Sequence, residues 1–183
     1  MSEQPYMRNE LSGTIGGHAV QAGVIHGDVV IDAVAQARVQ HALTLRADRL
    51  AVYEEFLESA VQLAKDLQKE ASRTANMVAR RLATPDLVFT LERDVKRLRA
   101  PIDHLSELKA KVLQVGPESV TDAASSVLGA SLAVWYSTQL VFGNSGVDWR
   151  RWPKDHERMQ ERLPKQLEAF MQEVRKVREA PPV

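Results

Sequence analysis

The sequence has 183 residues and contains no cysteine. This absence excludes disulfide bonds, thiolate nucleophiles and cysteine-ligated metal sites. An excess of either charge is also missing, because 24 basic residues balance 24 acidic residues. A general nucleic-acid-binding protein carries a basic excess, so we predict no nucleic-acid partner. Residues 1–10 lack the basic region and apolar run of a signal peptide, and we expect a cytoplasmic protein with a disordered N-terminus.

Patterns typical of catalysis are missing as well. The five histidines, at positions 18, 26, 41, 104 and 156, include no pair four residues apart and no His-Glu-x-x-His motif. No phosphate-binding loop and no Gly-x-Ser-x-Gly elbow occurs. We therefore predict no catalytic residue, no metal site, no cofactor and no enzymatic activity. The neighbours Asp103 and His104 are interpreted as a surface pair.

Glycine is scarce except in residues 11–31, which hold five of the nine glycines and no Lys or Arg. The segment 13–20 repeats at 23–30, with identical residues at four of the eight positions. Low charge, β-branched residues and no proline are typical of segments that stack as strands. We predict a short β-hairpin or β-arch in which the two repeats form stacked rungs. The residues expected to carry self-association are Ser12, Gly13, Ile15, Gly17, Val20, Gln21, Gly23, Ile25, Gly27, Val29 and Val30.

Two plainer interpretations of residues 11–31 stay open: a hairpin that caps the rest of the protein, and a glycine-rich linker. The linker does not account for the many β-branched residues, which are an aggregation hazard unless they serve pairing.

The rest of the chain has helical periodicity. A helix is expected from about 39 to 82, with apolar positions every seven residues at Leu43, Leu50, Leu57, Ala64, Ala71 and Val78, and a neighbouring row that includes Val39, Tyr53, Ala60 and Leu67. Thr84-Pro85 should start a second helix, which Pro101 should kink or split. Gly116-Pro117 should separate it from a third helix at 117–142. A fourth is expected at about 154–179, with Pro164 breaking its first part.

These patterns predict a mainly α protein, an antiparallel bundle of four or five helices with the β element at its N-terminus. We divide the chain into a disordered segment at 1–10, the β motif at 11–31, a junction at 32–41 and the bundle at 42–183.

The third helix is unusual because no charged residue occurs from Ala123 to Val147. Its length admits a membrane span, and Trp149, Arg150, Arg151 and Trp152, which follow it, resemble a membrane interface. The alternative is a helix in the centre of the bundle, and we favour it because six hydroxyl or amide side chains lie between 123 and 143. On that interpretation the two tryptophans close the end of the bundle. The basic cluster of Arg93, Lys96, Arg97 and Arg99 is preceded by Glu92 and interrupted by Asp94, and it indicates a solvated helix face rather than a patch for nucleic acid or anionic lipid.

Residues 9–29 resemble the bacterial amyloid signalling motif of actinobacteria. The matching positions are Asn9, Ser12-Gly13, Gln21-Ala22-Gly23, Ile25 and Gly27-Asp28-Val29, while Ile15 and Ala19 stand where the motif usually has valine. The match covers about 21 of the 183 residues. The helical remainder is similar in style to small actinobacterial helical proteins. It also resembles membrane-targeting helical effectors of the fungal HeLo type and their bacterial analogues, although those analogues commonly carry the motif at the C-terminus.

The resemblance implies that an activated NLR-like receptor, or another protein with a matching motif, templates residues 11–31 into a β-solenoid amyloid. We expect a signalling adaptor or effector of a bacterial immune or programmed-death circuit, with the bundle as its output module. The alternatives are a membrane-permeabilising effector that inserts residues 117–142 once activated, and a non-enzymatic scaffold whose hairpin caps the bundle.

Overall fold

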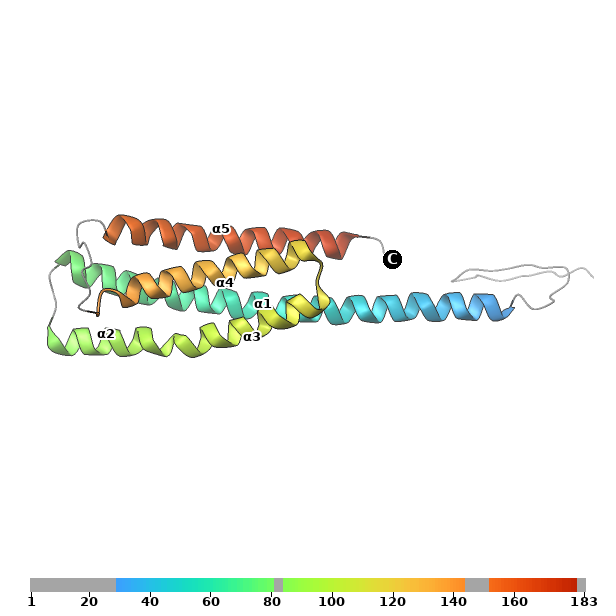
Figure 1. The fold of residues 1–183 in the computed structure, drawn as a ribbon, viewed down its shortest axis with the longest axis horizontal. Helices are drawn as coiled ribbons and strands as arrows, with labels where there is room; N and C mark the ends of the chain where they lie inside the picture. The colour runs from blue at the N-terminus through green and yellow to red at the C-terminus, as the bar shows by residue number, and fades with distance from the viewer. Residues whose placement is uncertain (1–28, 81–83, 144–151, 181–183) are drawn as a thin grey trace, which may run out of the picture. The chain divides into compact units, whose positions relative to one another are not determined.

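A computed structural model describes residues 29–80, 84–143 and 152–180, and all regular structure in these ranges is helical. The helices are α1 (Val29–Arg80), α2 (Pro85–Arg97), α3 (Arg99–Val115), α4 (Glu118–Gln139) and α5 (Trp152–Glu179) (Figure 1). The chain divides into two compact units, Met1–Thr44 and Leu45–Val183. The second unit is the predicted helical bundle.

Helix α1 begins ten residues earlier than the sequence pattern indicated. It starts at Val29, so the predicted junction at 32–41 and the last residues of the predicted β motif, Val29 to Ile31, are helical here. The physical reason is that residues 28–84 contain neither glycine nor proline, so nothing in the sequence stops the helix before Gly27. The rest of the predicted β motif lies outside the described residues.

The break between α2 and α3 is the effect of Pro101 that the sequence predicted. Proline has no backbone N–H, so the carbonyl of Arg97 loses its helical partner, and the ring crowds that carbonyl. The chain responds at Leu98, whose N–H bonds Val95 O at 3.1 Å in a tighter turn, before Ile102 N resumes the helical pattern to Leu98 O at 3.2 Å. Thr84 caps α2 as predicted, accepting a hydrogen bond from Leu87 N.

The bundle places its rods in a ring, with α2 and α3 forming one bent rod. The Lys111–Glu55 ion pair joins α3 to α1. Trp135 Nε1 of α4 donates to Val95 O of α2 at 2.9 Å. Helix α4 also packs on α5, and the rings of Phe170 in α5 and Phe56 in α1 lie 4.8 Å apart, which closes the ring. This order is the up-and-down antiparallel arrangement that short connections favour.

The core of the bundle lies along one stripe of α1 and the inner faces of the other helices. The buried residues of that stripe are Tyr53, Phe56, Ala60, Leu63, Leu67 and Ala71. Of the row predicted at every seventh residue, Leu43 is exposed, Leu50, Leu57 and Ala64 are only partly buried, and Ala71 is buried. The core is therefore centred on the neighbouring row that contains Tyr53, Ala60 and Leu67.

Helix α5 continues through Pro164, which was predicted to break it. The side chain of Pro164 is exposed. Leu163, Leu167 and Phe170 around it are buried in the core. Packing of this amphipathic face outweighs the one backbone hydrogen bond that the proline removes.

Candidate functional site

Most residues of the predicted self-association motif lie outside the described residues: Ser12, Gly13, Ile15, Gly17, Val20, Gln21, Gly23, Ile25 and Gly27. Val29 and Val30, which we included in the second rung, form the first residues of α1. The structure therefore contradicts the prediction that Val29 and Val30 lie in a strand.

The predicted membrane interface is the second candidate, and only Trp152 of its four residues is described. Trp152 is 4 % exposed. Its indole N–H donates to Ser137 O in α4 at 2.8 Å, and its ring stacks on His156 with centroids 4.5 Å apart. The Trp152 side chain thus belongs to the bundle core in this structure, and it would have to leave the bundle to reach a membrane interface. Trp149, Arg150 and Arg151 lie outside the described residues.

Ser137 and His156 form a buried polar pair beside Trp152. Ser137 Oγ and His156 Nδ1 are 3.0 Å apart, and His156 Nε2 has no hydrogen-bond partner among the described residues. Burial lowers the pKa of His156, since a charged ring would lose its hydration. The distance resembles that of a nucleophile and its base, but Ser137 and His156 are 5 % and 3 % exposed. A substrate has no access to them, and the pair is part of the packing between α4 and α5.

The basic cluster on α2 and α3 is a solvated, charge-paired face, as predicted. Lys96 contacts Glu92 at 2.7 Å, and Arg99 contacts Asp103 at 2.9 Å. Arg93 and Arg97 both lie near Asp94, which also accepts a hydrogen bond from Arg73 of α1 at 3.1 Å. This hydrogen bond from Arg73 lowers the pKa of Asp94. Each cation is thus matched within the protein, and His104 is exposed as expected.

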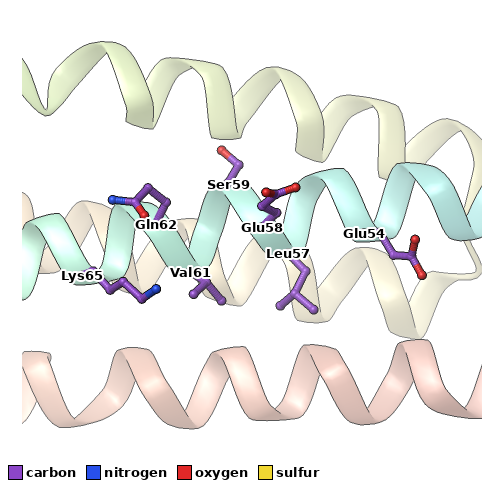
Figure 2. A pocket seen from close by; sticks show the side chains of 7 residues that line it. All are labelled: Glu54, Leu57, Glu58, Ser59, Val61, Gln62 and Lys65. Carbon is purple, nitrogen blue, oxygen red and sulfur yellow. The ribbon is translucent and has the colours of Figure 1, made fainter.

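A groove of about 630 Å³ follows the outer face of α1 and is open to solvent (Figure 2). All seven of its lining residues come from α1: Glu54, Leu57, Glu58, Ser59, Val61, Gln62 and Lys65. Leu57 and Val61 point toward α5, and Ser59 points toward α3. Its titratable side chains, Glu54, Glu58 and Lys65, are exposed, and a ligand lying in the groove would remain largely in water.

The described residues also contain neither a metal-binding cluster nor a membrane-spanning helix. No group of three or more acidic or histidine side chains in these ranges is placed to hold a metal ion. Within the same ranges, no helix combines the length and apolar character needed to cross a membrane. Helix α4 instead buries much of its surface in the bundle, at Val120, Ala124, Val127, Ala130, Ser131, Val134, Trp135, Ser137 and Thr138.

The beginning of α1 carries a feature that sequence reasoning missed by treating 32–41 as a junction. Val34, Val39 and Leu43 are large apolar residues of the first unit, and they are 46 %, 54 % and 43 % exposed. Their signal was available, because Arg38 is the only formally charged residue between Ala33 and Leu45. A helix with so little charge and such exposed side chains is typical of an interaction segment.

The chain matches no family model, no curated protein and no solved structure. The function therefore has to be argued from the residues and the geometry alone.

Proposed function

We propose that this protein is a signalling adaptor or effector of a bacterial immune or programmed-death circuit. In this proposal, residues 11–31 receive the signal by pairing as β rungs with the matching motif of an NLR-like receptor or of further copies of the chain. The bundle of residues 45–180 is the output module, and the protein acts in the cytoplasm. The observation that carries the proposal is the ten-residue repeat, together with its resemblance to amyloid signalling motifs.

The bundle supports a binding role over an enzymatic one. The Ser137–His156 pair is closed to substrate, and the groove on α1 is open to water. The basic cluster of α2 and α3 is paired with acids of the same protein. Within the described residues, the features that a partner can reach are therefore exposed surfaces and not an enclosed site, which fits an adaptor.

The proposal has no membrane-insertion step. Releasing α4 from the bundle would expose the buried side chains that it shares with α3 and α5, at about 25 cal/mol per Å² of apolar surface. Trp152 would also have to leave the core to reach an interface. The membrane-permeabilising alternative therefore lacks an observation in its favour.

The test is assembly of the motif. A peptide of residues 9–32 and the full chain should both form thioflavin-positive fibres with a diffraction spacing of about 4.8 Å along the fibre. A peptide of the same composition in scrambled order is the control, because it keeps the low charge and loses the repeat. Soluble, thioflavin-negative behaviour of the peptide and the full chain would sink the proposal. Protection of residues 11–31 from protease in the soluble monomer would instead favour the capping hairpin.

A further inference from the structure

The segment from Val34 to Leu43 has two apolar sides. At about 100° per residue, Val39 and Leu43 share one side of the helix, and Val34 lies about 140° around it. All three side chains are at least 43 % exposed. A helix with one partner needs one apolar stripe, whereas a helix between two neighbours needs two stripes on nearly opposite sides.

The low charge of the segment identifies the kind of partner. Arg38 is its only formally charged residue, while the following stretch 46–58 contains Arg46, Asp48, Arg49, Glu54, Glu55 and Glu58. A strongly charged partner would find no complementary side chains on such a helix. Identical helices lying side by side in the same direction would instead repel each other through a single arginine per copy, which water and salt screen.

The spacing of the proposed motif matches the spacing of packed helices. If each copy contributes two stacked rungs, successive copies lie about 9.5 Å apart along the assembly. Packed helices have axes about 8–10 Å apart. Helix α1 starts two residues after Gly27, so copies stacked through their motifs would hold their α1 helices at the distance at which side chains interlock.

We propose that residues 34–43 form a parallel helical array between copies of this chain, in which Val39 and Leu43 of one copy pack on Val34 of the next. This inference rests on the proposed function, because stacking of the motif is what brings the helices together. The array is open rather than closed, since the two stripes lie on different sides of the helix. It adds a second, helical interface to the β pairing.

The experiment uses the cysteine-free full chain, in which Ala37→Cys gives a single attachment site for a spin label. Ala37 is exposed and lies about 120° or more around the helix from Val39 and Leu43, and about 60° from Val34. In assembled fibres, labels on neighbouring helices about 10 Å apart should show strong spin–spin broadening. A label at Ser106→Cys, on the exposed side of α3, reports on the bundle and serves as the comparison.

A matched pair of double variants tests the contact itself. Val39→Glu with Leu43→Glu should abolish the broadening, because two carboxylates per copy enter the interface. Gln40→Glu with Thr44→Glu adds the same charge at the same spacing, one residue along, and should leave it intact. All four side chains are exposed, so circular dichroism should show an intact bundle in both variants.

The outcomes separate the two proposals. Fibres with broadening that only the Val39/Leu43 variant removes support the array. Fibres without broadening, or broadening that survives in the Val39/Leu43 variant, overturn the array and leave the motif proposal standing. If the full chain forms no fibres at all, both proposals fail.

Discussion

Trp152 gives the sharpest test of how the bundle ends. Its indole is buried in a cluster with Met77 of α1, Leu91 of α2 and Val141, and replacing a buried Trp with Ala costs about 3–5 kcal/mol of unfolding free energy. Its N–H also caps the carbonyl of Ser137, whose helical partner Val141 N bonds Thr138 O instead. Losing that hydrogen bond adds about 1 kcal/mol. We expect Trp152→Ala to destabilise the protein by about 4–6 kcal/mol, against a typical domain stability of about 5–15 kcal/mol.

The measurement is urea unfolding followed by circular dichroism, with thermal unfolding as a second readout. At about 3 °C per kcal/mol, the midpoint should fall by about 12–18 °C. Trp152→Phe keeps most of the apolar surface and loses the cap, so it should cost about 1–2 kcal/mol. Phe89→Ala removes an aromatic side chain that is 67 % exposed and should change stability by less than about 0.5 kcal/mol. If Trp152→Ala changes stability as little as Phe89→Ala does, the indole is not in the core, and a membrane-interface position for Trp152 becomes the better interpretation.

Two further predictions concern buried polar groups. Burial holds the pKa of His156 below the ordinary value of 6.5, so the unfolded state binds more protons, and stability should fall as the pH drops below about 6.5. Thermal unfolding from about pH 7.5 to 5.5 should show this slope, His156→Gln should flatten it, and His104→Gln, at an exposed histidine, should not. Tyr53 is fully buried, and its hydroxyl has no hydrogen-bond partner in the part of the chain that the structure describes. Tyr53→Phe should therefore be neutral or up to about 1 kcal/mol stabilising in urea unfolding, and a clear loss of stability would show that the hydroxyl has a partner.

Local signals in the sequence predicted the helices and their order well. The helix boundaries of the structure fall at capping and helix-breaking residues, namely Thr84-Pro85, Pro101 and Gly116-Pro117. Each of these signals acts within one helical turn. The charge-free stretch of α4 from Ala123 onward likewise predicted a helix inside the bundle. Its hydroxyls fit there because Ser131 and Thr138 donate to carbonyls four residues earlier in the same helix, so their burial requires no partner from elsewhere.

What the sequence could not predict depends on contacts between distant residues. The stripe of α1 that faces the core includes Phe56 and Leu63, and its choice over the row with Leu50 and Leu57 depends on the position of Phe170 more than 100 residues away. The continuity of α5 through Pro164 depends in the same way on the buried face around it. His156 looks like any surface histidine in the sequence, and only the packing of α5 on α4 places it beneath Trp152.

The start of α1 changes what activation of the motif requires. The second predicted rung runs to Val30, while the structure has Val29 and Val30 in the helix. Both cannot hold at once, so β pairing over the full repeat must unwind the first residues of α1. Helix ends fray at little cost, because the first four N–H groups have no helical partner and few contacts hold them. Residues 34–43 lie beyond that first turn, and their helix would survive the unwinding. Pairing over the full repeat therefore requires Val29 and Val30 to leave the helix, whereas residues 34–43 can pack in the helix that they already form.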